Sequence, residues 1–397
     1  MTATVPAAHW AARARRLADM LRAGGALHSE AVADAFAAVP RHAFISGHYL
    51  GGGPGRTVLD PEHPDGELLA LAYADRGIMT HTPADEAGGY SSASQPAVVA
   101  RMLEAAQLTE GTRVLEIGAG TGYNAALISR LTRTPVTTVE ASPVVAAEAR
   151  AALRRTGHSE QRVRVVTGDG YAGHAGGGPW DRIIVTCGIA GLSPHWLDQL
   201  APHGSVIAPL AHAGVHPLAR ISGHGDGVVG RLVTMADFMN ATGPLYAGAR
   251  TSPSTRSRLF PAPATRLPGT VPAALDPRGS YSDLWMYLAA QDPRITCASA
   301  EGPIDHTGCA LVTEDETTAV FVRPGGLYLT EDTPSTRALA EVVAHRVAAW
   351  DREGRPALDR WTCRLTLAGD PESPIQVPGA WALDPEPAAG REGRSRV

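Results

Sequence analysis

The segment Val114-Leu115-Glu116-Ile117-Gly118-Ala119-Gly120-Thr121-Gly122 joins a largely apolar run to a glycine-rich turn. Glycine has no Cβ, so the backbone can turn sharply there and approach a ligand closely. A helical pattern over 122–132 follows the turn, which therefore lies between a strand and a helix. In an α/β protein such a turn faces the crevice at the carboxyl end of the strand, where nucleotides bind.

Strands and helices alternate along the chain on both sides of this turn. The sequence predicts helices over 95–107, 122–132, 143–156 and 194–200. It predicts strands over 113–117, 136–140, 163–167, 182–186 and 206–209. This alternation indicates a mainly parallel sheet covered by helices on both faces, which is an α/β, Rossmann-like fold.

The flanking regions have a different pattern. Helices are predicted over 7–23 and 29–39, and a smaller α+β domain is predicted near the C-terminus. We expect five parts: a helical acceptor-side region 1–90, a cofactor-binding domain 91–245, a linker 246–275, a C-terminal α+β domain 276–383 and a disordered tail 384–397. The linker is predicted from its Pro, Ser, Thr and Arg content without hydrophobic periodicity.

Composition excludes several classes of protein. The net charge of −5 and the scattered basic residues do not favour a nucleic-acid or anionic-membrane partner. The four cysteines form no C-x-x-C pair, so we expect no metal site. The N-terminus has no signal-peptide pattern and no run is long enough to span a bilayer, so we expect a cytoplasmic protein.

Two carboxylates follow the glycine turn at positions that suit a nucleoside. Glu140 ends the next strand, where it could accept hydrogen bonds from a ribose diol. Asp169-Gly170 ends the third strand, where the acid could accept from an adenine amino group, although Asp-Gly is also common in plain turns.

The pattern favours S-adenosyl-L-methionine over NAD as the cofactor. NAD fingerprints read G-x-G-x-x-G, whereas here the third glycine falls one position early, at Gly122. Glu116 precedes the first glycine, and S-adenosylmethionine carries an ammonium group that such an acid could balance. No constellation for hydride transfer is evident in the sequence.

Four segments resemble the protein-L-isoaspartate O-methyltransferases. They are Val39–Phe44, Ala72–Arg76, the Ser92-Ala93-Ser94-Gln95-Pro96 stretch and Val114–Tyr123. The combination is specific, and it covers roughly residues 10–240. The resemblance implies a class I S-adenosylmethionine methyltransferase fold and a peptide or protein partner that carries an aspartyl or isoaspartyl carboxylate.

The resemblance also implies roles for individual residues. Ser94 falls at the family's catalytic serine, with Ser92 and Gln95 as candidate substrate contacts. The implied cofactor contacts are Glu116, Gly118, Ala119, Gly120, Gly122, Asn124, Glu140, Asp169, Gly170 and Thr186.

The chemistry suits a serine without a catalytic triad. A carboxylate, with a pKa of about 4, is already ionised at neutral pH and needs no general base. A hydroxyl can instead hold one carboxylate oxygen by a charge-assisted hydrogen bond. The alternative is that Ser94 caps the helix that begins near Gln95-Pro96.

Several other polar residues could have either a functional or a structural role. Arg41, His42, Asp75 and Arg76 could contact substrate or form structural ion pairs, and we favour structure. His81 lies in a predicted acceptor-side loop, where a single histidine is usually solvated.

The sequence departs from the family pattern at three places. The segment 77–93 is longer than the family's short link, the cofactor turn continues Tyr123-Asn124-Ala125-Ala126-Leu127, and about 150 residues follow the methyltransferase part. These features resemble the branch that methylates an aspartate of a ribosomally made, modified peptide, leading to an aspartimide. General isoaspartyl repair and a catalytically silent peptide-binding module are the alternatives, and the C-terminal region could recognise peptide or only stabilise the protein.

Overall fold

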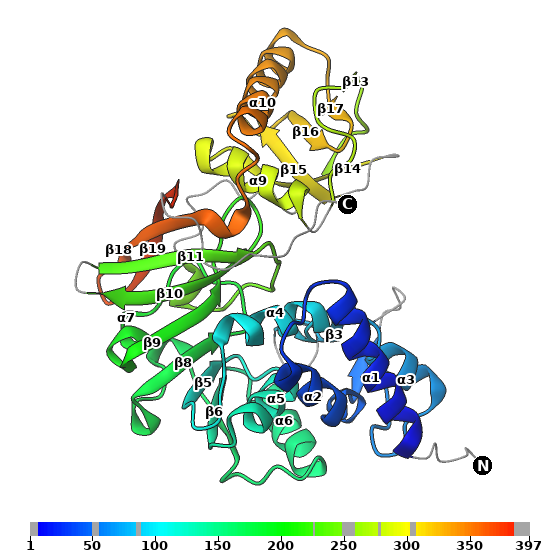
Figure 1. The fold of residues 1–397 in the computed structure, drawn as a ribbon, viewed down its shortest axis with the longest axis vertical. Coiled ribbons are helices and arrows are strands. Elements are labelled where there is room, and N and C mark those ends of the chain that lie inside the picture. The colour runs from blue at the N-terminus through cyan, green and yellow to red at the C-terminus, as the bar shows by residue number, and fades with distance from the viewer. Residues whose placement is uncertain are drawn as a thin grey trace. The chain divides into compact units, whose positions relative to one another are not determined.

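The computed structural model describes residues 7–49, 55–84, 89–224, 227–247, 259–276, 279–301 and 307–384. The chain forms two compact units, Met1–Cys187 with Ser193–Ala208, and Gly188–Leu192 with Pro209–Val397. Figure 1 labels most of their helices and strands.

The first unit contains a parallel sheet with the strand order β9-β8-β5-β6-β7. Its strands are β5 (Val114–Ile117), β6 (Val136–Glu140), β7 (Val163–Thr167), β8 (Trp180–Val185) and β9 (Leu200–Pro209). The central strand β5 is buried throughout, as are Ile183 and Ile184 beside it. Strands buried on both faces are continuously apolar, which is why the sequence pattern located them correctly.

Helices connect these strands in the predicted order. They are α4 (Pro96–Ala106), α5 (Tyr123–Thr132), α6 (Pro143–Arg155) and α7 (Pro194–Asp198). The Ser142 side chain accepts a hydrogen bond from the Val145 amide, and Pro143 occupies the first turn of α6. The predicted α/β, Rossmann-like arrangement is confirmed, together with an additional C-terminal region.

The N-terminal region packs short elements beside this sheet (Figure 1). They are α1 (Ala7–Ala23), α2 (Glu30–Ala38), the 3-10 helix Arg41–Phe44, β1 (Gly47–His48), β2 (Thr57–Val58), α3 (Gly66–Ala72), β3 (Ile78–His81) and β4 (Ser91–Ala93). The β3–β4 hairpin is antiparallel, with Ile78 opposite Ala93 and His81 opposite Ser91. The sequence did not predict this hairpin, because its strands are too short to show a periodicity of two.

The second unit contains one antiparallel set of strands and one mixed sheet, in which β12 and β14 are parallel and the other pairs are antiparallel. One consists of β10 (Leu218–His224), β11 (Gly227–Thr234), β18 (Trp361–Asp370) and β19 (Ser373–Leu383). The other is a six-stranded sheet with the order β12-β14-β15-β16-β17-β13. Its strands are β12 (Leu259–Phe260), β13 (Thr265–Pro268), β14 (Ile295–Ala300), β15 (Thr307–Val312), β16 (Ala319–Arg323) and β17 (Gly326–Leu329). The unit's helices are α8 (Pro244–Ala247), α9 (Ser280–Gln291) and α10 (Pro334–Arg352).

Two predicted boundaries differ from this division. The predicted methyltransferase domain continues to residue 245, whereas β10 and β11 belong to the second unit, where β11 pairs with β18. The predicted linker 246–275 contains β12 and β13, and Thr265–Pro268 pairs with β17. Pairing between segments that lie far apart in the chain leaves no local signal in the sequence. Residues 248–258 of that linker and 385–397 of the predicted tail lie outside the described residues.

None of the helices in the described part of the chain combines the length and the hydropathy needed to cross a membrane.

A buried arginine joins three parts of the N-terminal region. The Arg41 side chain is completely buried, and its guanidinium donates to the carbonyl oxygens of Ala72 at 2.5 Å and Ser94 at 2.9 Å. Burial lowers the pKa of Arg41 to about 10, which leaves the group charged at neutral pH. Arg41 is therefore a structural residue, as the sequence favoured.

Replacing Arg41 should destabilise the first unit. In Arg41→Met several buried carbonyl groups lose their donor, and each unsatisfied group costs about 1–3 kcal/mol. We expect the free energy of unfolding to fall by about 2–4 kcal/mol in urea titrations. The control is Arg22→Gln, an exposed ion-pair residue, which should change it by less than about 1 kcal/mol. Equal stabilities of the two variants would contradict the assignment.

Candidate active site

Three glycines with positive φ form the turn between β5 and α5. Their φ angles are 95° at Gly118, 51° at Gly120 and 85° at Gly122. A Cβ on Gly118 would lie 2.4 Å from Thr186 Oγ1, so no other residue fits there without displacement. The Thr186 hydroxyl donates to the carbonyl oxygens of Gly118 at 2.5 Å and Ile117 at 3.1 Å. Thr186 therefore stabilises the conformation of the turn.

The backbone amides of the turn are bonded within the protein. Gly118 and Ala119 both donate to the Val139 carbonyl oxygen, at 2.8 and 3.2 Å. Gly120 donates to Glu140 Oε2 at 3.0 Å, and Gly122 donates to the Ala119 carbonyl oxygen at 2.8 Å. A pyrophosphate cradle requires such amides to point freely at the ligand. The turn thus fits a nucleoside without phosphate better than it fits a dinucleotide.

Glu116 lies beneath the turn and is completely buried. Its Oε1 accepts from Asn124 Nδ2 at 2.7 Å, and its Oε2 accepts from the Thr138 hydroxyl at 2.5 Å. Burial is the largest influence on this carboxyl group and raises its pKa to about 7. Asn124 Oδ1 is buried without a hydrogen-bond partner. These contacts show that Glu116 and Asn124 stabilise the turn, while their predicted contact with the cofactor stays a prediction.

Glu140 and Asp169 lie at the carboxyl ends of β6 and β7. Glu140 Oε2 accepts from Gly120 and Oε1 accepts from the Ser142 amide at 3.1 Å, so each oxygen keeps one lone pair. Asp169 is exposed, and its Oδ1 accepts from the Tyr171 amide at 2.9 Å. At Gly170 a Cβ would lie 2.6 Å from Ile117 Cγ2, so glycine keeps this edge open. These carboxylate oxygens are acceptors that fit the hydroxyls of a ribose and the amino group of an adenine.

The acceptor-side strand β4 lies directly against the glycine turn. A Cβ on Gly120 would be 3.5 Å from the Ser92 carbonyl oxygen and 3.9 Å from Ser91 Oγ. Ser94 follows two residues later, and two residues of extended chain span only about 7 Å. The structure therefore brings the predicted acceptor segment and the predicted cofactor turn together.

The helix after Ser94 is capped by a different residue. Asp75 Oδ1 accepts from the Ala97 amide at 2.8 Å, and Asp75 Oδ2 accepts from Gln95 Nε2 at 3.1 Å. Ser94 contributes only its carbonyl oxygen, which accepts from Arg41. Within the described part of the chain, the Ser94 hydroxyl has no protein partner, so the capping role considered for it is wrong.

Comparisons with known proteins agree with this geometry. The family model for protein-L-isoaspartate(D-aspartate) O-methyltransferase matches residues 72–243. A protein-L-isoaspartate O-methyltransferase of Rhodopseudomonas palustris (strain BisB5) is 38% identical over 216 residues, which are 54% of this chain and 86% of the relative. One of Thermococcus onnurineus (strain NA1) is 36% identical over 192 residues, which are 48% of this chain and 75% of the relative.

The chain belongs to the protein-L-isoaspartate O-methyltransferase family. It is therefore an enzyme of the S-adenosylmethionine-dependent methyltransferase type, as the glycine turn and the segment around Ser94 predicted.

A solved structure bears on the C-terminal region. A structure named protein-L-isoaspartate O-methyltransferase covers 91% of this chain and 98% of its own chain, with a TM-score of 0.50 and 24% sequence identity. This likeness concerns the fold alone. The alignment extends beyond the parallel sheet into the C-terminal region.

Sequence reasoning missed several polar residues beside the site. His81 is not solvated as expected, because it lies on β3, is 4% exposed and contacts Glu148. The sequence did not indicate a role for Arg56 or Glu148, because neither belongs to a recognisable motif. His42 accepts or donates a hydrogen bond with the Tyr73 hydroxyl at 2.9 Å, which supports the structural reading of that residue. Among the described residues no group of three His, Cys, Asp or Glu could hold a metal ion.

The raised pKa of Glu116 predicts a specific pH dependence of stability. Between the ordinary value of 4.5 and about 7, the folded protein holds a proton that the unfolded chain has released. The free energy of unfolding should therefore fall as pH rises through this range, by about 3 kcal/mol. Glu116→Gln has no carboxyl group at this position, so its stability should lack this dependence on pH. In urea titrations without cofactor, its free energy of unfolding should therefore rise relative to that of the wild type between pH 4.5 and pH 8.

The matched control for this measurement is Glu110→Gln, whose carboxylate is 70% exposed. Its stability should follow that of the wild type at every pH. If Glu116→Gln and the wild type gave parallel curves, the buried carboxyl group would not be the source of the pH dependence.

Proposed function

We propose that this protein transfers a methyl group from S-adenosyl-L-methionine to an aspartyl or isoaspartyl carboxylate of a peptide or protein. One observation carries the proposal: the Ser94 hydroxyl is left without a capping role, on a segment that follows a strand packed on the glycine turn. Membership of the family indicates the type of reaction. The packing of β4 on the glycine turn indicates which side of the site would bind the acceptor.

The residues around the turn would hold the cofactor. Glu140 has one lone pair left on each oxygen for the ribose hydroxyls, and Asp169 keeps Oδ2 for the adenine amino group. The backbone at Gly118, Ala119, Gly120 and Gly122 gives the ligand close access. When bound, S-adenosylmethionine supplies a methyl group activated by its sulfonium.

The acceptor requires orientation and loss of water more than proton transfer. A carboxylate is already the nucleophile at neutral pH. The Ser94 hydroxyl can donate to one carboxylate oxygen and so direct the other oxygen towards the donor. Arg41 and Asp75 fix the backbone on both sides of Ser94, which keeps the hydroxyl in one place.

The finer proposal is that the substrate is a dedicated modified peptide, in which the methyl ester leads to a succinimide or aspartimide. A neighbouring backbone nitrogen can attack the carbonyl carbon of the methyl ester and release methanol, whereas a carboxylate offers no comparable leaving group. The long segment between Arg76 and Ser94 supports this reading, because it forms the β3–β4 hairpin beside the turn and borders the acceptor side. Residues 85–88 of that segment lie outside the described residues. General isoaspartyl repair uses the same chemistry and is the alternative.

Ser94→Ala should separate cofactor binding from turnover. Calorimetry should show an unchanged affinity for S-adenosylmethionine, because the hydroxyl is directed at the acceptor. The turnover number for an isoaspartyl peptide should fall about 10- to 100-fold, the size of a lost charge-assisted hydrogen bond. Ser94→Thr, which keeps a hydroxyl, should recover part of it, and Ser92→Ala should lose less. Full activity of Ser94→Ala would move the acceptor contact to another residue.

A panel of acceptors distinguishes the two substrate classes. Transfer of labelled methyl groups should be measured to linear isoaspartyl peptides, aspartyl peptides and cyclised peptides that contain aspartate. Efficient turnover of the linear isoaspartyl set indicates repair. Turnover confined to a cyclised peptide, followed by loss of methanol or water in its mass spectrum, indicates the dedicated function. A lack of binding to either S-adenosylmethionine or S-adenosylhomocysteine would contradict both.

A further inference from the structure

A cavity of about 240 Å³ lies between α6 and the N-terminal region, beside the glycine turn. Gly120 and Thr121 of the turn and Ser91 of β4 form one part of its lining. Arg56, Glu148 and Arg155 supply its fully charged side chains. All these residues belong to the first unit, and the cavity adjoins both the cofactor turn and the acceptor-side strand. We call it the arginine cavity.

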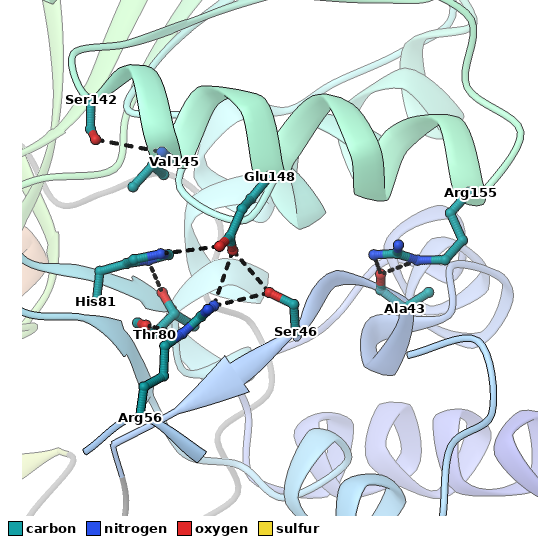
Figure 2. A network of polar contacts seen from close by, with 9 residues as sticks. All are labelled: Ala43, Ser46, Arg56, Thr80, His81, Ser142, Val145, Glu148 and Arg155. Carbon is teal, nitrogen blue, oxygen red and sulfur yellow. Dashed lines mark hydrogen bonds and ion pairs between the residues drawn. The ribbon is translucent and has the colours of Figure 1, made fainter. Parts of the chain in front are cut away.

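Glu148 neutralises one of the two arginines. Its Oε2 accepts from the Ser46 hydroxyl at 2.9 Å and from Arg56 Nη2 at 3.1 Å, while its Oε1 lies 3.4 Å from His81 Nε2 (Figure 2). The contact with His81 and these hydrogen bonds lower the pKa of Glu148 to about 2. Glu148 is therefore a carboxylate at neutral pH, and it is already paired.

Among the described residues that line the cavity, no acid forms an ion pair with Arg155. Its Nε and Nη2 donate to the carbonyl oxygen of Ala43 at 3.2 and 2.8 Å, which is a neutral acceptor (Figure 2). The lining thus contains two guanidinium groups and one carboxylate. The described lining therefore carries one more guanidinium group than carboxylate.

Both arginines keep unused donors. Arg56 Nε donates to the Thr80 carbonyl oxygen at 2.9 Å, and Arg56 Nη2 donates to Ser46 and Glu148. Among the described residues, Nη1 of Arg56 and Nη1 of Arg155 have no acceptor. The Arg56 side chain is only 22% exposed, so its orientation is fixed by the protein. Guanidinium groups held in this way favour carboxylate or phosphate ligands.

The size of the cavity limits the ligand. Drug-sized ligands occupy pockets of about 300–1,000 Å³, and a water molecule takes about 30 Å³. The arginine cavity lies below the range for drug-sized ligands and is large enough for one acidic side chain. Its acceptor-side wall comes from Ser46, His81 and Ser91, which belong to the region that would face the peptide.

We propose that the arginine cavity binds a second carboxylate of the acceptor peptide, from an aspartate or glutamate close to the methylated residue. This inference rests on the proposed function and adds a preference for acidic neighbours. A carboxylate there would satisfy the spare donors and balance the excess charge, so the site would select among acceptors that share the reacting group.

The test compares peptides that differ in one charge. Isoaspartyl peptides with glutamate at each of the two positions before and after the acceptor are compared with their glutamine counterparts. At one position, the wild type should show about tenfold lower KM for glutamate, the size of a charge-assisted hydrogen bond. Arg155→Gln should reduce this preference to near unity and leave kcat and the Kd for S-adenosylmethionine unchanged. Its amide can still donate to Ala43.

Arg154→Gln is the matched control, because it removes an exposed arginine from the adjacent position of α6 and should keep the preference. Arg56→Gln is the second variant should Arg155→Gln fail to fold, and it should lose the preference as well. Equal KM values for every glutamate and glutamine pair with the wild type would overturn the inference alone. A raised Kd for S-adenosylmethionine in Arg155→Gln, with the peptide preference intact, would also overturn it by assigning the site to the carboxylate of the cofactor. Absence of methylation of every peptide would instead overturn the proposed function.

Discussion

The close packing of Gly118 against Thr186 is the constraint on which the cofactor side of the protein depends. With φ at 95° and 2.4 Å between a would-be Cβ and Thr186 Oγ1, the position admits only glycine. The same hydroxyl donates to the Gly118 carbonyl oxygen, which fixes the direction in which the chain leaves β5. The residues from Gly120 to the start of α5 follow directly from this position in the chain. Because the turn amides are bonded to Val139 and Glu140, the site is built for a nucleoside without phosphate.

Two charged residues that lie far from Ser94 in the sequence organise the backbone on the acceptor side. Asp75 caps α4 from 22 residues away, and Arg41 holds the Ser94 carbonyl oxygen from 53 residues away. Both charged groups satisfy backbone atoms that would otherwise be unpaired in a buried place, where each would cost about 1–3 kcal/mol. The consequence is that Ser94 can leave its hydroxyl unused. A local capping serine would have used the hydroxyl that the proposed function assigns to the acceptor.

The sequence predicted the parallel strands and their helices well, because each is a local pattern: an apolar run, a cap such as Ser142, or a proline in a first turn. It could not predict β3–β4, nor the pairing of β11 with β18, because those contacts join segments without periodicity or far apart in the chain. For the site, the motif residues Ser94, Glu140 and the glycines were found, and their predicted contacts with ligands remain predictions. The roles of Glu148 and Arg56 were missed, since an ion pair between residues 92 positions apart leaves no trace in either segment.

An acceptor that is already negatively charged changes what the protein has to provide. The acceptor needs hydrogen-bond donors and positive charge near the turn. An acid whose charge is not compensated would repel it. Glu116 and Glu140 are both close to the turn, and burial offsets the repulsion from Glu116 because a pKa of about 7 lets it hold a proton part of the time. Glu140 is held by two backbone amides, which compensate its charge in part. On the acceptor side, the paired Glu148 and the spare donors of Arg56 and Arg155 give the surroundings a positive excess. The arrangement of charge therefore favours a carboxylate acceptor independently of the sequence motif around Ser94.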